Sequence, residues 1–238
     1  MCGRFTLRTS LNLLGEHFLF SMSPDISLPQ KYNIAPTHSV ATLTAPLGQR
    51  QLHWMHWGLI PSWSKDPSRA SRMINARSET LHEKPSFRQA FQKRRCLILA
   101  DGYYEWRNKQ PFFIHRSDHQ PFAFAGLWES WTPSQASTES RHDTPQPLQS
   151  TTIITTEANE FAAPIHHRMP VILNPNNYDR WLADDASQID TLQSLLVDPA
   201  NSNEMASFEM TAVSRHVNKV ANDDPQCIDP SATQQELF

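Results

Sequence analysis

The chain begins MCGRF, so its second residue is a cysteine. If Met1 is removed, Cys2 carries a free α-amine and a thiol on adjacent carbons, which is a 1,2-aminothiol. The amine has an ordinary pKa of roughly 7.7–8.0 and the thiol one of roughly 8.5, so both have reactive fractions near neutral pH. Such a pair can attack one carbonyl carbon in two successive steps. The competing interpretation is structural, because a free cysteine often packs as a small apolar side chain.

Glu105 is the candidate for proton transfer, and it stands among three aromatic residues in DGYYEW. On a strand its side chain shares a face with Tyr103, while Tyr104 and Trp106 point to the other face. Aromatic neighbours would exclude water and raise the pKa of the carboxyl group by desolvation, which suits a proton shuttle. The alternative is a solvent-facing glutamate on an amphipathic strand.

Two histidines, an asparagine and an arginine complete the set of reactive candidates. In IHHRMP, a strand would turn His166 and His167 to opposite faces, so at most one of them should face a given site. In INARSET, Asn75 and Arg77 would share a face if that segment is extended. The amide would then orient a substrate and the guanidinium would bind a phosphate. The alternatives are ordinary surface or core histidines and an ordinary salt bridge for Arg77.

Two tryptophans, Trp57 and Trp63, flank the segment GLIPS. A loop with two tryptophans is often packed against the core. It can also stack on nucleobases, as single-strand binding proteins do. Both interpretations stay open from the residues alone.

Composition and spacing argue against several other kinds of site. The three cysteines are far apart and no CxxC or HExxH pair occurs, so we predict neither a disulfide framework nor a metal site. His53 and His56 in HWMHW fall on opposite faces of a strand, which argues against a metal site there. With only 6 glycines and no nucleotide-binding glycine loop, we predict no nucleotide cofactor and no other cofactor.

The net charge of −3 argues against a general nucleic-acid coat protein but leaves room for a small local basic site. The first ten residues contain no long apolar run, so they do not resemble a signal peptide. No stretch approaches the length of a membrane span. We therefore expect a cytosolic globular protein with reduced thiols and no membrane partner.

The elements that must position these residues follow from the spacing of apolar side chains. Helical spacing predicts helices over residues 9–20, 86–95, 175–182 and 186–196. Apolar and β-branched runs predict strands over residues 39–46, 50–60, 96–106, 111–116, 121–131, 150–158 and 207–213. The first two strands are predicted to pair through a turn near Gly48, and the runs between 96 and 131 to form an antiparallel meander.

The remaining stretches complete the predicted organisation. The polar stretch 132–150 is predicted to be an exposed loop, and the tail from about Asn222 is predicted to be irregular. We find no internal repeat and no linker. We therefore predict a single α+β domain over residues 1–238, with its core over about 2–228. This core is expected to be a curved, mostly antiparallel β-sheet or barrel with flanking helices.

Taken together, the motifs resemble a known family. MCGRF, YNIAPT, WGLIPSW, INARSET, DGYYEW, PFFI, IHHRMP and VSRHVN occur in the order typical of the SOS-response-associated peptidase (SRAP) domain. Members of this family are also called abasic-site processing or shielding proteins. The resemblance extends from Cys2 to about Cys227, and it implies the same barrel-like fold with flanking helices.

The resemblance also implies a function and a set of site residues. Family members bind single-stranded DNA and cross-link to abasic sites through the cysteine behind the initiator methionine. The catalytic residues implied are Cys2, Asn75, Glu105 and His166. The DNA-binding residues implied are Arg4, Asn33, Trp63, Arg77 and Arg168, and the basic side chains of Arg215 and Lys219 lie in the same motif segments. The residue after the first histidine of the motif is often acidic in the family, whereas here it is His167.

Three other functions stay open at this point. An N-terminal-nucleophile peptidase or amidohydrolase would use Cys2 against a peptide carbonyl, with Met1 removed by self-cleavage. A non-covalent module would bind single strands through Trp63 and arginines, and a purely structural interpretation would assign every motif to packing. The family resemblance favours single-stranded DNA with abasic sites as the partner. It also favours a monomer in the bacterial cytoplasm, at the nucleoid when bound to DNA.

Overall fold

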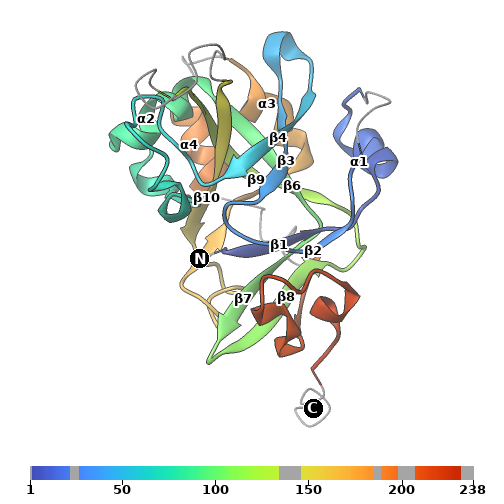
Figure 1. The fold of residues 1–238 in the computed structure, drawn as a ribbon. Coiled ribbons are helices and arrows are strands. Elements are labelled where there is room, and N and C mark those ends of the chain that lie inside the picture. Colours follow the sequence, from blue (N-terminus) through green and yellow to red (C-terminus); the bar gives the residue numbers. More distant parts are fainter. Residues whose placement is uncertain (1, 22–26, 134–145, 185–188, 198–206, 232–238) are drawn as a thin grey trace.

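The computed structural model describes residues 2–21, 27–133, 146–184, 189–197 and 207–231 (Figure 1). The α-helices in these ranges are α1 (Leu11–Phe18), α2 (Pro85–Lys93), α3 (Tyr178–Leu182) and α4 (Ile189–Val197). The strands are β1 (Arg4–Leu7), β2 (Lys31–Ile34), β3 (Ser39–Thr44), β4 (Gln51–Trp57), β5 (Asn75–Arg77), β6 (Arg95–Ala100), β7 (Gly102–Arg107), β8 (Gln110–Arg116), β9 (Phe122–Trp131), β10 (Leu148–Glu157), β11 (Arg168–Pro170), β12 (Ile172–Leu173) and β13 (Phe208–Ala212). Short 3-10 helices include η3 (Ser78–Thr80), η7 (Arg215–Asn218) and η8 (Pro225–Ile228).

The described strands form two sheets, and the larger sheet closes on itself. Its strand order is β11-β10-β4-β3-β6-β9-β12, with β5 also paired to β10. Because β10 pairs with both β4 and β9, the strands β10, β4, β3, β6 and β9 close a barrel. The smaller sheet has the order β13-β8-β7-β1-β2 and lies below the barrel in Figure 1. The pairings are antiparallel except those of β10 with β4 and β5, so the predicted α+β class with a barrel core is confirmed.

The helices begin and end where local chemistry allows. The Ser10 side chain accepts a hydrogen bond from the Leu13 amide and caps α1, whose buried face is formed by Leu14 and Phe18. Helix α2 has Pro85 in its first turn, where no backbone donor is needed, and it buries Phe87, Ala90 and Phe91. Helices α2 and α3 pack on β6 of the barrel. The predicted helical faces of α1 and α2 are therefore confirmed.

The predicted meander between residues 96 and 131 is wrong in one respect. Strands β7 and β8 do pair, but β6 pairs with β3 and β9 of the barrel and β7 pairs with β1 in the other sheet. The chain changes sheets at Asp101, whose buried carboxylate accepts hydrogen bonds from Thr6, Arg8 and Thr9. These bonds direct β7 toward β1, and this corner is what places Glu105 beside the amino end of the chain.

The other element predictions fare as follows. The hairpin of β3 and β4 around Gly48 is confirmed, as are the strands β10 and β13. The predicted helix 186–196 begins on residues that the structure does not describe, and most of the predicted loop 132–150 is also outside the described residues. The irregular tail is partly wrong, because η8 forms and Pro230 pairs with Val213. The prediction of a single domain over 1–238 stays a prediction.

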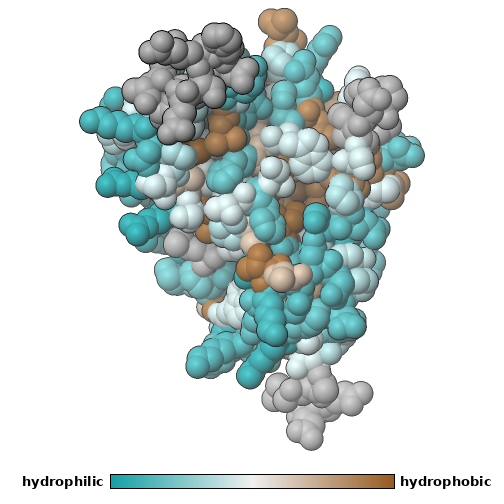
Figure 2. All heavy atoms as spheres, in the orientation of Figure 1, coloured by the Kyte–Doolittle hydropathy of each residue, from teal (hydrophilic) through white to brown (hydrophobic). Residues whose placement is uncertain are grey.

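Most large apolar side chains are buried in one cluster that includes Cys2, Phe5, Trp57, Tyr103 and Phe124. A second cluster joins β7 and β8 to the C-terminal segment and contains Tyr104, Phe113, Val213, Val217 and Cys227. The face that Figure 2 shows is mostly hydrophilic with scattered apolar groups. Within the described ranges, every helix is too short or too polar to cross a lipid bilayer.

Candidate active site

Cys2 lies just before β1 and is fully buried. The Asn75 side chain, on β5, donates a hydrogen bond from Nδ2 to the Cys2 carbonyl oxygen over 2.9 Å. The Asn75 Oδ1 atom is buried and has no hydrogen-bond partner within the described part of the chain. Since β5 is held by parallel pairing to β10, the barrel itself positions the amide that holds Cys2.

The Cys2 thiol is in its protonated form at neutral pH in this structure. Burial raises the pKa of the thiol far above its ordinary value, and the negative charge of Glu105 raises it further. Its Sγ atom is 3.9 Å from the Arg4 carbonyl oxygen, to which it donates a weak hydrogen bond. Any reaction of this sulfur therefore needs a group that removes its proton.

Glu105 is suited to that task. It lies on β7, and only 6% of its surface is exposed. Burial raises the pKa of its carboxyl group, and the positive charge of the chain's amino terminus offsets part of that rise. Of its aromatic neighbours, Tyr103 is fully buried and shares a face of β7 with Glu105, and the charge of Glu105 acts on the Tyr103 hydroxyl.

His166 and His167 precede β11 in a turn rather than a strand. Their rings stack with centroids 4.4 Å apart, so the predicted placement on opposite faces is wrong. The reason is local, since the His166 amide donates to the Ala162 carbonyl and ends a turn. Partial burial lowers the pKa of the His166 imidazole, and the charge of the amino terminus lowers it further, so the amino terminus acts on both Glu105 and His166.

The backbone of Arg168 orients the His166 ring. The Arg168 amide donates to His166 Nδ1 over 2.9 Å, and the Arg168 carbonyl oxygen is 3.1 Å from the same nitrogen. When Nδ1 is unprotonated it accepts from the amide, and when it is protonated it donates to the carbonyl. The ring is therefore held in one place in both charge states.

The Arg168 side chain is engaged inside the protein. Its Nη1 and Nη2 atoms donate to the two carboxylate oxygens of Glu79, in η3, over 2.6 and 3.0 Å, and Nη2 also donates to the Thr155 carbonyl over 2.6 Å. Arg168 is buried, so this geometry does not favour direct DNA contact and instead fixes the segment that carries His166. Arg77, by contrast, is exposed on β5, where its backbone pairs with β10.

Arg4 and Asn33 form one connected unit with the C-terminal segment. Arg4 Nη1 donates to Asn33 Oδ1 over 2.7 Å and to the Val217 carbonyl over 3.0 Å. Asn33 is buried, and its Nδ2 donates to the carbonyls of Val217, Lys219 and Asn222. Asn33 therefore holds Arg4 and this segment in place, rather than presenting its own side chain to a ligand.

The two tryptophans of the GLIPS segment have different environments. Trp57 is fully buried, and its Nε1 donates to the Ile74 carbonyl over 3.0 Å, so it packs and cannot stack on a base. Trp63 is 64% exposed. It borders a hollow of about 380 Å³ that Lys65 and Arg69 also line. A planar ring beside two cations is the arrangement expected of a nucleic-acid contact.

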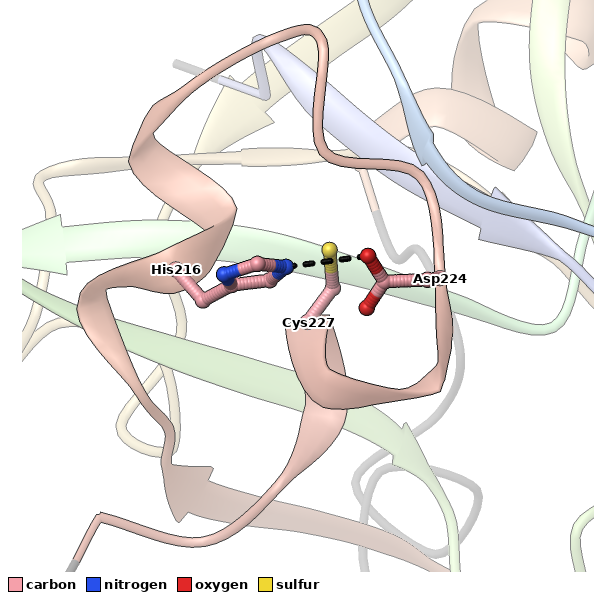
Figure 3. Close-up of side chains that lie close together, drawn as sticks. All are labelled: His216, Asp224 and Cys227. Carbon is pink, nitrogen blue, oxygen red and sulfur yellow. Dashed lines mark hydrogen bonds and ion pairs between the residues drawn. The ribbon is translucent and has the colours of Figure 1, made fainter.

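One cluster was missed by the sequence, because its spacing matches no metal motif. His216, Asp224 and Cys227 place their ligand atoms within 4.8 Å of one another (Figure 3). The Asn222 amide is 3.1 Å from His216 Nδ1 and donates to it, so the imidazole proton is on Nε2 and is donated to Asp224 Oδ2 over 3.0 Å. Asp224 Oδ1 also caps η8 at the Gln226 amide. The lone pair that a metal would need at Nε2 is thus occupied, and the cluster connects η7 to η8.

Comparisons with known proteins find relatives over most of the chain. Residues 1–220 match the family described as "SOS response associated peptidase (SRAP)". The chain is 38% identical over 235 residues to the abasic site processing protein YoqW of Bacillus subtilis, covering 96% of this chain and 99% of that protein. It is 35% identical over 214 residues to the abasic site processing protein HMCES of Gallus gallus, covering 78% of this chain and 59% of that one. A crystal structure of a Bacteroides thetaiotaomicron protein superposes with a TM-score of 0.77 at 25% identity, covering 97% of this chain and all of the other.

Proposed function

The chain belongs to the SRAP family, and on that premise we propose that it processes abasic sites in single-stranded DNA by bonding Cys2 covalently to the opened deoxyribose. The observation that carries this proposal is that Asn75 of β5 and Glu105 of β7 both act on Cys2, which lies just before β1. The names of the curated relatives support DNA lesion processing as the setting.

The proposed reaction has two steps at one carbon. Once Met1 is removed, the Cys2 α-amine attacks the aldehyde carbon C1′ of the ring-opened sugar, and uptake of one proton with loss of water gives an iminium. The Cys2 sulfur then adds to the same carbon and closes a five-membered thiazolidine. The adjacent amine and thiol make this closure intramolecular, which removes most of its orientational cost. An open iminium permits β-elimination and strand cleavage, and thiazolidine closure suppresses both.

The roles proposed for the surrounding residues follow from their contacts. Asn75 holds the Cys2 carbonyl and thereby fixes the direction of the amine and thiol. Glu105 accepts the thiol proton and serves in proton transfers during imine formation and reversal. His166, held by the Arg168 backbone, orients or protonates a deoxyribose hydroxyl.

DNA binding is proposed to use a few cations around this site. Arg4 and Arg77 contact flanking phosphates, and the exposed side chains of Arg215 and Lys219 add further positive charge. Arg168 and Asn33 act indirectly, by fixing the segments around them, and Trp63 stacks on a base. Neutralising only a few phosphates predicts a modest dependence of binding on salt, and a monomer suffices for this footprint.

The test is intact mass spectrometry of a cross-linking reaction without any reductant. Met1-processed protein is mixed with a single-stranded oligonucleotide that carries one abasic site. We expect an adduct with the mass of protein plus DNA minus one water, absent with an intact strand and mapping to Cys2. Cys2→Ala should lose the heat-stable adduct yet form an imine that borohydride traps through its α-amine. Cys96→Ala is the matched control, since Cys96 is also a buried free thiol. Full heat-stable cross-linking by Cys2→Ala would refute the mechanism.

A further inference from the structure

Two adjacent tyrosines on β7 face opposite sides and have different hydrogen bonding. Both Tyr103 and Tyr104 are fully buried. The Tyr104 hydroxyl donates to the Tyr32 carbonyl over 2.7 Å. The Tyr103 ring packs edge-on against Phe124 in the main core, and its hydroxyl makes no hydrogen bond to any described residue. A buried hydroxyl without a partner is costly, so the Tyr103 hydroxyl needs an explanation.

The position of Tyr103 explains why its buried hydroxyl has no partner among the described residues. It is two residues before Glu105 on the same strand, so the two side chains share a face. It also pairs with Phe5 of β1, the strand that leads back to Cys2. Cys2 and Tyr103 belong to the same buried cluster. Burial raises the pKa of the Tyr103 hydroxyl, and the charges of Cys2 and Glu105 raise it further. A hydroxyl with so high a pKa stays protonated and is a permanent hydrogen-bond donor.

We propose that Tyr103 is a further catalytic residue that donates a hydrogen bond to the Cys2 sulfur while the thiazolidine ring closes. This inference rests on the proposed function. In the closing step a bond forms between Cys2 Sγ and C1′ of the iminium. The thiol proton passes to the Glu105 carboxylate, and the π electrons of the C=N bond become the lone pair of the ring nitrogen. Tyr103 keeps its own proton throughout.

The physical reason is the environment of the sulfur. Cys2 is fully buried, and the negative charge of Glu105 acts on it, so negative charge on the sulfur is disfavoured there. A hydrogen bond that the Tyr103 hydroxyl donates to the sulfur offsets that penalty as the charge develops, without reorganisation of water. The imine step involves the amine rather than the sulfur, so it does not need this donor.

The experiment compares Tyr103→Phe with the matched control Tyr104→Phe. The rate of heat-stable adduct formation reports closure, and the rate of borohydride-trapped adduct reports the imine. For Tyr103→Phe we expect closure to slow by about 10- to 100-fold, the loss typical of a hydrogen bond to a charged atom. We expect its imine rate to stay within about twofold of the unmodified protein. Tyr104→Phe should leave both rates unchanged.

Stability provides an independent readout. Tyr103→Phe removes an unpartnered hydroxyl, so it should leave the urea midpoint unchanged or raise it, whereas Tyr104→Phe should lower it. If Tyr103→Phe does not fold, 3-fluorotyrosine at position 103 keeps the ring and strengthens the donor, and closure should then be as fast or faster.

Several outcomes would overturn the proposal. These are unchanged closure in Tyr103→Phe, an equal slowing of both steps, or slower closure with fluorotyrosine. If the unmodified protein forms no adduct at all, the proposed function fails instead, so the two failures are distinguishable.

Discussion

Asp101 is expected to be the residue on which the position of Cys2 depends most, because it joins the two sheets. It is 2% exposed and lies between β6 and β7. Its Oδ1 accepts from Thr6 Oγ1 over 2.6 Å and from Arg8 Nε over 3.2 Å. Its Oδ2 accepts from the Arg8 amide and from the amide and hydroxyl of Thr9. Strand β1 and the residues after it are thus attached to this corner by one carboxylate.

The substitution Asp101→Asn keeps the shape and replaces one acceptor oxygen with an amide donor. The less costly orientation places the new nitrogen at Oδ1, where two donors lose their acceptor instead of three. Thr6 loses a hydrogen bond to the carboxylate, which it partly recovers at the Gly102 carbonyl 3.3 Å away, and Arg8 loses its ion pair. With about 0.5–1.5 kcal/mol for the partly recovered Thr6 bond and about 1.5–3 kcal/mol for the Arg8 bond, the free energy of unfolding should fall by about 2–4.5 kcal/mol.

Urea denaturation followed by circular dichroism measures this change. The matched control is Asp118→Asn, because the Asp118 side chain is 45% exposed and its ion pair with Arg116 is at the surface. Surface pairs contribute at most about 1 kcal/mol, so the control should barely move. A loss below about 1 kcal/mol for Asp101→Asn, or one equal to the control, would refute the idea that this carboxylate anchors β1.

Two further predictions concern acid–base chemistry and DNA binding. Burial raises the pKa of the Glu105 carboxyl group in the folded protein. The protonated group therefore adds to the free energy of unfolding below its ordinary pKa, and this contribution is lost as the pH rises through the raised pKa. Glu105→Gln should therefore unfold at higher urea at pH 7 while cross-linking about 100- to 10,000-fold more slowly, and lower stability would contradict this account. Trp63→Ala should weaken binding of an intact single strand by about 1–3 kcal/mol in fluorescence anisotropy. Trp54→Ala, which removes a 42% exposed tryptophan of β4, should have little effect, and equal losses in the two variants would count against base stacking at Trp63.

The sequence by itself determined the features that depend on near neighbours. Apolar spacing alone predicts α1 and α2 with their buried faces, and the β-branched runs predict β3, β4, β10 and β13. The ordered motifs were also enough to identify the family and the candidate residues. The aromatic neighbours of Glu105 in the chain predict a raised pKa of its carboxyl group, and burial in the folded chain produces that rise. Each of these depends on helical or strand periodicity, which a short segment already contains.

Only the tertiary structure decided what depends on contacts between distant segments. Asn75 and Cys2 are 73 positions apart and meet because β10 holds β5 beside the amino end. Arg168 and Glu79, 89 positions apart, form an ion pair that a motif cannot reveal. Trp57 and Trp63, which lie close together in the chain, end as one buried and one exposed side chain. The physical reason is the same in each case, because burial and charge pairing are set by which strands become neighbours, and that is a property of the whole chain.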